Sequence, residues 1–333
     1  MTNFSDIQTL RTGKALILAT KPFAQENRLR SWLETILTLS LIVLCFSVTL
    51  LEINVFIRLC FSLLCSLLYT RMFIIYHDYQ HHAILQKSKV AEWVMIIYGI
   101  FILAPQNIWK RSHDHHHNHN SKLTISGIGS YPTISKKRYL ALTPAEKQLY
   151  LINRHPLTII FGYFTLFMYW LNIRSYMQSP KNHKDSLVAL VLHFVVGGCL
   201  WYFLGFTTFM LSWFVPFIIA FALGSYLFYS QHNFPNAKFR ENHDWTYDNA
   251  ALASTSYMVM NPVMNWFTGN IGYHHVHHMN SKIPFYRLRE AMESMPELKN
   301  VSTTSWNPIE MYRCFQLKLW DEEKDKMITL KEL

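Results

Sequence analysis

The sequence predicts an all-helical, multi-pass membrane protein with two transmembrane helical hairpins, interfacial or re-entrant helices and a cytoplasmic, histidine-rich cap. Of its 333 residues, 50% are hydrophobic and only 16% are charged, against roughly 25% charged in soluble domains. Long apolar runs alternate with basic segments, and histidines gather at three places. We expect one domain over residues 1–333, with a core at about 30–290, an N-terminal segment at 1–29 and a C-terminal tail at 291–333.

The N-terminal part predicts the first hairpin. Residues 1–31 are basic and should form a cytoplasmic segment with a short interfacial helix. The apolar runs 32–51 and 55–76 each approach the ~20 residues that a helix needs to cross the hydrocarbon core. Because the link between them carries no Lys or Arg, the positive-inside rule places it outside and places the N-terminus and His77 inside.

The next apolar run, 91–104, is 14 residues long and is followed by a proline, which is short for a span. If it crossed the membrane, the histidines before and after it would lie on opposite sides and could share no metal. We therefore expect it to be re-entrant or interfacial. Further on, Thr143-Pro144-Ala145-Glu146 predicts a helix start, with an N-cap threonine and proline at the first helical position.

Three further apolar runs follow, at 157–173, 187–204 and 208–229. The basic link at 174–186 should be cytoplasmic, so the last two runs form the second hairpin and 157–173 lies in the interface or re-enters. The alternative, in which 157–173 and 187–204 cross, stays open. Both termini and the histidine clusters then face the cytoplasm, at the inner membrane if the protein is bacterial.

The histidine clusters have helical spacing. Two of them have histidines at i, i+3 and i+4, which places three rings on one helix face, and the first has a pair at i, i+4. These residues are His77 and His81, then His113, His116 and His117, then His274, His277 and His278. Eight imidazoles exceed the four ligands that a zinc site usually takes and imply two metal ions, that is, a dimetal centre.

The type of ligand limits which metals the site can hold. No cysteine belongs to the clusters, which argues against iron–sulfur clusters and structural zinc, and no Glu-x-x-His motif of soluble di-iron proteins is present in them. We interpret the site as two iron ions held by neutral nitrogen ligands, while imidazole chemistry alone leaves zinc and copper open.

The motifs in their context resemble the integral-membrane fatty acid desaturases, in particular the acyl-lipid, omega-6-like branch. The chain has His77-Asp78-Tyr79-Gln80-His81, His113-Asp114-His115-His116-His117 and His274-His275-Val276-His277-His278, with Trp109-Lys110-Arg111-Ser112 before the second box and Asn265 to Gly272 before the third. The resemblance covers about residues 30–290. Many relatives have Cys-Gly where this chain has Tyr79-Gln80, which concerns the subfamily and the substrate.

The resemblance implies a di-iron enzyme that uses O2 to insert a cis double bond into an acyl chain, lipid-linked and omega-6/delta-12-like. It implies a ninth ligand, His232, which follows Gln231, and it names no catalytic residue beyond the metal ligands. The expected metal set is therefore His77, His81, His113, His116, His117, His232, His274, His277 and His278. Candidates to orient the ligand rings are Asp78, Asp114, Asn118, Asn233 and Asn270, whereas His82 and His275 are extra histidines beside the boxes.

The sequence also limits which molecules the protein can be expected to bind. It has no dinucleotide-binding glycine motif, no iron–sulfur cysteine set and no fused haem motif, so a ferredoxin-like or cytochrome b5-like donor is implied. No nucleic-acid recognition motif accompanies the net charge of +10. Lys110, Arg111 and Arg240 could hold an anionic lipid head group or an acidic donor, or simply anchor the membrane.

Two other functions remain open. A hydroxylase or ketolase of the same superfamily, acting on alkane, sphingolipid or carotenoid, would use the same boxes. A non-enzymatic metal transporter would place its ligands at mid-membrane, whereas these clusters lie at the ends of spans or beyond them.

Overall fold

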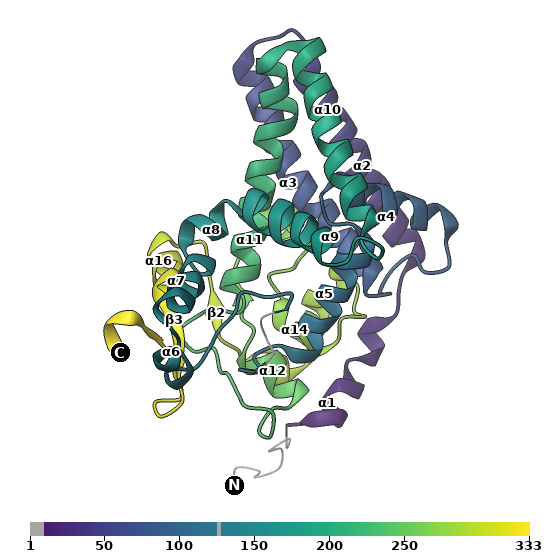
Figure 1. The fold of residues 1–333 in the computed structure, drawn as a ribbon. Coiled ribbons are helices and arrows are strands. Elements are labelled where there is room, and N and C mark those ends of the chain that lie inside the picture. The colour runs from purple at the N-terminus through teal and green to yellow at the C-terminus, as the bar shows by residue number, and fades with distance from the viewer. Residues whose placement is uncertain (1–9, 125–127) are drawn as a thin grey trace.

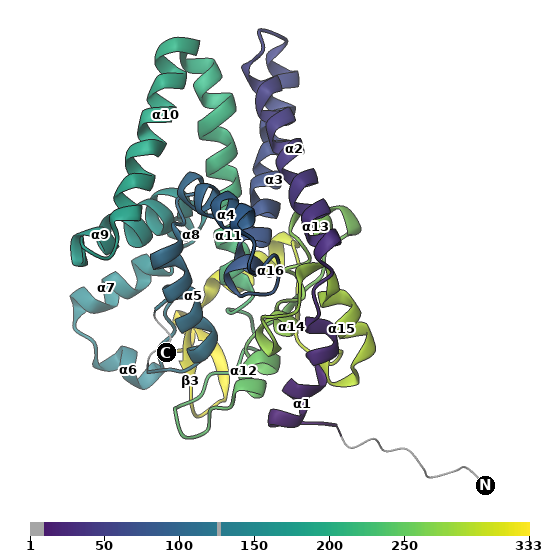
Figure 2. The ribbon, with the colours of Figure 1, turned by 90° about the vertical axis from the view of Figure 1, so that its right-hand side faces the viewer.

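The computed structural model describes residues 10–124 and 128–333 and is mostly helical. Two long helical hairpins rise side by side from a broader base of short helices and loops (Figure 1, Figure 2). The first consists of α2 (Arg28–Leu50) and α3 (Val55–Gln80), and the second of α10 (Lys184–Phe209), η3 (Met210–Phe214) and α11 (Val215–Ser230). The tips of both hairpins lie at the end opposite to the helices of the base (Figure 1).

Local sequence explains where the hairpins begin and turn. The side chains of Asn27 and Asn54 cap α2 and α3 by accepting backbone N–H groups of the first turn. The second hairpin reverses at Gly205, whose φ of +82° is readily adopted only by glycine. Three helical stretches are long and apolar enough to cross a membrane, and they are Arg28–Leu50, Val55–Gln80 and Lys184–Ser230, the last of which contains this turn.

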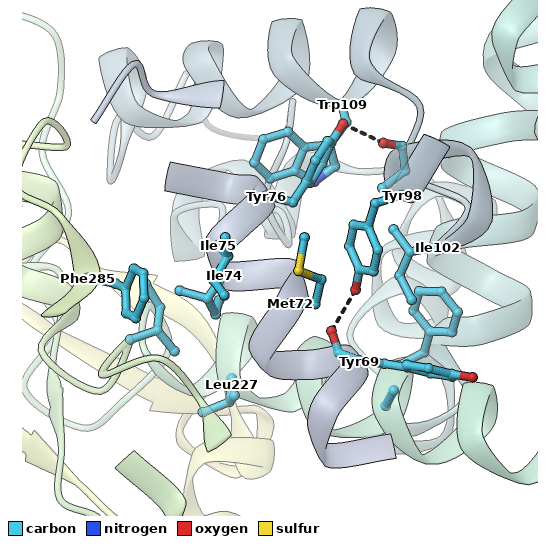
Figure 3. Close-up of a cluster of buried hydrophobic side chains, with 14 of the residues drawn as sticks. Tyr69, Met72, Ile74, Ile75, Tyr76, Tyr98, Ile102, Trp109, Leu227 and Phe285 are labelled. Carbon is cyan, nitrogen blue, oxygen red and sulfur yellow. Dashed lines mark hydrogen bonds between the residues drawn. The ribbon is translucent and has the colours of Figure 1, made fainter. Parts of the chain in front are cut away.

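The segment after α3 returns to the level of the first histidine box. Helices α4 (Lys89–Phe101) and α5 (Gln106–His119) meet at 89° instead of forming one straight helix. The hydroxyl of Tyr98 on α4 donates to the carbonyl of Tyr69 on α3 at 2.7 Å (Figure 3). A Cβ atom on Gly99 would lie 2.9 Å from the hydroxyl oxygen of Tyr76, so α4 packs closely on α3 only because this residue is glycine.

The apolar run at 157–173 packs against α10 and α11 but does not form a third long helix. It is divided between α8 (Pro156–Ile160) and the π-helix η2 (Tyr163–Arg174), and α9 (Ser175–Gln178) follows. Together these elements run across the foot of the second hairpin (Figure 1).

The base contains the remaining helices. These are α1 (Gly13–Ala19), α6 (Lys136–Ala141), α7 (Pro144–Asn153), α12 (Tyr247–Ala253), α13 (Pro262–Phe267), α14 (His274–Met279), α15 (Leu288–Ser294) and α16 (Pro308–Gln316), with 3-10 turns at Lys21–Ala24, Phe285–Arg287, Pro296–Leu298 and Leu330–Glu332. The predicted start of α7 is present as a capping box, in which Thr143 and Glu146 each accept from the other's backbone N–H.

Two small sheets correct the all-helical prediction. β1 (Tyr257–Met258) pairs in parallel with β2 (Thr303–Thr304), and β3 (Leu317–Asp321) pairs antiparallel with β4 (Lys326–Thr329). The first pair is only two residues long, and such a segment is too short to show a period of two in the sequence. The chain is therefore mostly helical with few strands, and its C-terminal tail ends in a β-hairpin packed on the base.

Candidate metal centre

The structure brings all nine predicted ligands together. One group contains His77, His81, His113, His117 and His277, and the other contains His116, His232, His274 and His278. Within each group, one ring nitrogen per residue lies within 4.8 Å of all the others, and each group could hold a metal ion. Two separate groups are what a centre of two metal ions would need.

The ring nitrogens of the larger group converge from three elements. The Nε2 atoms of His77, at the end of α3, and His113, on α5, are 2.9 Å apart. His117 Nε2 lies 3.1 Å from His113 Nε2 and 3.0 Å from His277 Nε2, on α14. His81 also belongs to this group, and its Nε2 is buried without a hydrogen-bond partner.

The smaller group is centred on His232, which follows the end of α11. Its Nε2 lies 3.1 Å from His116 Nε2 and 2.9 Å from His274 Nε2. The Nε2 atom of His278 is buried and has no hydrogen-bond partner. His232, the ninth predicted ligand, thus lies between the histidines of α5 and those of α14.

The protonation state of these rings suits metal binding. Burial lowers the pKa of seven ring systems well below the usual value, and nearby histidines add to the effect, at His81, His113, His116, His117, His274, His277 and His278. Burial lowers the pKa of His232 to about 3. Neutral imidazoles each offer a lone pair, and unpartnered buried Nε2 atoms are the donors that transition-metal ions take. The residues present therefore fit two such ions.

A large cavity reaches the centre. Its volume is about 810 Å³, and His77, His113 and His274 form part of its wall. The side chains of Phe73, Leu227 and other apolar residues from α3, η2 and α11 line much of the rest. This size is within the range of ligand cavities, and the cavity joins an apolar interior to the histidine groups.

Comparison with known proteins shows which family has these histidine boxes. A family model described as fatty acid desaturase matches residues 53–304, which include all three histidine boxes.

The chain belongs to the fatty acid desaturase family.

Curated members of the family resemble this chain at modest identity. A fatty acid desaturase of Bacillus subtilis is 29% identical over 285 residues, which cover 85% of this chain and 80% of that protein. An sn-1 oleoyl-lipid 12-desaturase of Synechocystis is 24% identical over 255 residues, covering 76% of this chain and 70% of that protein. A chloroplastic omega-6 fatty acid desaturase of Arabidopsis thaliana is 24% identical over 255 residues, covering 71% and 54%.

One of the five residues expected to orient ligand rings does so in this desaturase-family chain. Asp78 Oδ1 lies 3.1 Å from His77 Nδ1, so His77 donates its Nδ1–H and turns the Nε2 lone pair toward the other histidines. The second oxygen of Asp78 accepts the backbone N–H of Phe285 at 2.6 Å. The carboxylate thus joins the first histidine box to the chain that follows the third.

The other four assignments are wrong. Each of these side chains has a partner away from the ligand rings, because a nearer group competes for it. Asp114 accepts from Lys110 at 2.6 Å, Asn118 donates to the Asp114 carbonyl, Asn233 bonds Arg154, and Asn270 donates to the Phe285 carbonyl.

The two extra histidines lie outside both groups. His275 is completely buried, and its Nε2–H donates to the carbonyl of Leu298 at 3.0 Å, which ties α14 to the turn after α15. His82 is exposed and contacts Gln86. Neither belongs to the metal-binding face of its box.

Sequence reasoning missed three buried arginines, Arg58, Arg71 and Arg154. Arg71 on α3 forms an ion pair with Glu34 on α2 at 2.5 Å and donates to the carbonyl of Trp266 on α13. Arg154 is fully buried and bonds the carbonyl of Pro132 at 2.6 Å and Asn233 Oδ1 at 2.5 Å. Arg71 could have been found, because an ionised residue within a predicted span is itself a signal. Arg154 lies in a polar segment of the sequence, where an arginine is not unusual, so nothing in the sequence indicated that it is buried.

Replacement of Asp78 by asparagine should weaken the metal centre. The amide loses the negative charge that favours the Nδ1–H tautomer of His77, and loss of such a partner lowers metal affinity or activity by about 10- to 100-fold. Iron content of the purified variant and double-bond formation in whole cells measure the effect. The matched control is Asp114→Asn, the corresponding aspartate in the second box, which should remain near the wild-type level. Equal results for both variants would contradict the role of Asp78.

Acid should destabilise the folded protein. The pKa of His232 is lowered to about 3 and that of His275 to about 4, both through burial, whereas the unfolded value is about 6.5. At a pH between the folded and the unfolded pKa, the unfolded chain binds more protons than the folded protein. The free energy of unfolding therefore falls as the pH drops below about 6.5. Each such histidine contributes about 1.4 kcal/mol less per pH unit. Thermal unfolding in detergent should show a lower midpoint at pH 5.5 than at pH 7.5, and a constant or rising midpoint would contradict this.

Proposed function

We propose that the protein is a membrane-bound, di-iron, O2-dependent fatty acid desaturase that inserts a cis double bond into a lipid-linked acyl chain, with omega-6/delta-12-like selectivity. The observation that carries the proposal is the pair of neutral histidine groups at one end of an apolar cavity of about 810 Å³. Relatives described as an oleoyl-lipid 12-desaturase and an omega-6 desaturase support the substrate class.

The proposed ligand set consists of His77, His81, His113, His116, His117, His232, His274, His277 and His278. Two iron ions bound there would supply, with O2, the oxidising power needed to remove hydrogen from an unactivated C–H bond. Asp78 holds the tautomer of His77, the apolar wall aligns the acyl chain, and burial of the histidines keeps water from the reacting carbons.

The proposed topology has both hairpins crossing the membrane, with the histidine boxes and both termini on the cytoplasmic side. The basic link at 174–186 and the uncharged hairpin tip at Gly205 support this orientation. The 89° bend between α4 and α5 supports a re-entrant or interfacial segment at 91–104, and the course of η2 across the foot of the second hairpin supports the same for 157–173. We propose that residues 1–333 form one functional domain.

The electrons come from another protein in this proposal. A ferredoxin-like or cytochrome b5-like donor would supply them, and one relative is described as an sn-1 acyl-lipid omega-3 desaturase (ferredoxin). The same ligand set also serves a hydroxylase or ketolase, so the product decides between these activities.

Fatty acid analysis of a bacterial host that expresses the protein tests the proposal. We expect new cis double bonds in membrane acyl chains, dependent on O2 and absent from cells that carry the empty vector. New hydroxyl or keto groups without new double bonds would assign the protein to the alternative activity. Zinc alone in the purified protein, with no O2-dependent product, would overturn both and favour metal transport.

A further inference from the structure

The cavity that reaches the histidines has a polar end with two arginines. Arg111 on α5 and Arg174 at the end of η2 both line it, together with Gln178. The exposed residues of the cavity wall are Arg111, Ile128, Trp170 and Gln178, so three of the four lie on α5 and the η2–α9 segment, whereas the histidines of the wall are buried or half-buried. The entrance therefore lies where α5 faces the η2–α9 segment.

Neither arginine is neutralised by a carboxylate. Among the residues that the structure describes, no aspartate or glutamate oxygen lies within 4 Å of Arg111 or Arg174. The nearby Asp114 is paired with Lys110, and Asp185 accepts the backbone N–H of Asn107. Arg174 instead places its guanidinium carbon 4.0 Å from the ring centre of Trp170. Two permanently charged groups with free donors at one opening favour an anionic ligand.

A buried histidine holds one of the two arginines in place. His183 also lines the cavity and is only 3% exposed. Burial and the nearby Arg111 lower its pKa, so the ring is neutral. Its Nε2 accepts from Arg111 at 3.2 Å, which leaves the proton on Nδ1, and that atom is buried without a partner. His183 thus fixes the guanidinium of Arg111 at the cavity wall.

The outer wall of the entrance is apolar. Along η2 and α9, Tyr169, Ile173 and Met177 are spaced by four residues and are 50%, 38% and 73% exposed. Trp170 and Arg174 lie beside this stripe and line the cavity. An apolar outer face with a tryptophan and an arginine at its edge suits the membrane interface. A ligand that enters here comes from the lipid layer, whereas a water-soluble acyl thioester would have to pass an apolar rim.

We propose that Arg111, Arg174 and His183 form a phosphodiester-binding site that selects membrane glycerophospholipids as the acyl carrier. The inference rests on the proposed desaturase function, since it assumes that the acyl chain of the lipid occupies the cavity toward the histidines. The two arginines bind the phosphate oxygens, and His183 positions Arg111 by accepting its N–H. The carrier is then a phospholipid rather than a galactolipid or a coenzyme A ester.

Lipid binding to the full-length protein tests the site without turnover. Protein purified in detergent, without an electron donor, is titrated with dioleoylphosphatidylglycerol, a dioleoyl galactolipid or oleoyl coenzyme A, and bound lipid is counted by native mass spectrometry. We expect the phospholipid to bind at least tenfold more tightly than the other two. The preference should be lost in R111Q/R174Q and should decrease in each single variant. K137Q/R138Q, which removes the same charge from the exposed helix α6, should retain it.

Three results would overturn the inference. They are equal binding of the galactolipid, tighter binding of oleoyl coenzyme A, and an unchanged preference in R111Q/R174Q. Thermal unfolding of each variant shows whether it is folded, and the single variants provide the comparison if the double variant is not. Fatty acid analysis of the wild type separates the two claims, because new double bonds together with an unchanged preference in R111Q/R174Q would leave the desaturase function standing and remove only the head-group site.

Discussion

Alanine in place of His277 is expected to abolish double-bond formation. In the proposed centre His277 is one of five ligands of one ion, and its Nε2 lies 3.0 Å from that of His117. The ring is completely buried, so neither water nor a neighbouring side chain can readily replace it. Activity should fall by more than the roughly 100-fold that loss of an outer partner can cause. Iron per protein should fall toward one.

The matched control is His119→Ala. His119 belongs to the same histidine-rich helix as three of the ligands, but its ring bonds the carbonyl of His115 and lies in neither group. It should retain product and two iron ions per chain. Wild-type product from the His277→Ala protein would refute its assignment as a ligand. Loss of product in both variants, with normal iron content, would show that the histidine cluster acts in some other way.

The second large effect is expected from Arg71→Met. This change leaves Glu34, whose side chain is 20% exposed, with only Arg30 as an ion-pair partner, at 3.7 Å. Breaking a fully buried ion pair costs about 3–5 kcal/mol, and this partly exposed pair should cost less. It also removes the donor to the Trp266 carbonyl and the guanidinium stacked 3.9 Å from the Trp266 ring centre. Since α13 leads into the third histidine box, iron binding should fall together with the thermal unfolding midpoint.

A second substitution separates charge from packing. Glu34→Gln/Arg71→Met removes both charges, so no carboxylate remains beside α3 without the guanidinium of Arg71. The double variant should unfold at a higher temperature than Arg71→Met and recover part of its iron. If the double variant is as unstable as the single one, the contacts of Arg71 with Trp266 matter more than the ion pair. An Arg71→Met protein as stable as the wild type would show that the pair contributes nothing.

Much of the architecture could be predicted from the sequence because its signals are local. The helix at Thr143 has a capping threonine, a proline and a glutamate within four residues. The histidine spacing at i, i+3 and i+4 placed the rings on common helix faces. The requirement that these faces meet then decided which apolar runs were expected to cross the membrane. The structure divides the nine histidines into the two groups that this count implied.

Residues that support the histidines could not be assigned in this way. Asp78 and Asp114 each follow the first histidine of a box, so the sequence treats them alike. Lys110, one helical turn before Asp114, takes that carboxylate into a local ion pair. Asp78 instead receives the N–H of Phe285, more than 200 residues further along the chain, which holds its other oxygen near His77. The deciding contact is long-range in one case and local in the other.

The same reasoning explains the missed C-terminal hairpin and Arg154. The guanidinium of Arg154 reaches Pro132, Asn233 and Leu317, three segments that are distant in sequence. No sequence pattern near Arg154 predicts these partners. Strands as short as β3 and β4 also give a weak alternation, and they depend on the buried Trp320 and Ile328 for their packing.

Two helices of the base serve both histidine groups at once. α5 gives His113 and His117 to one group and His116 to the other, while α14 gives His277 to the first and His274 and His278 to the second. An ion bound in either group would therefore fix the rotation of both helices and hold the remaining rings in place for a second ion. Loading of the proposed centre would then be cooperative, because capture of the first ion would lower the entropic cost of binding the second.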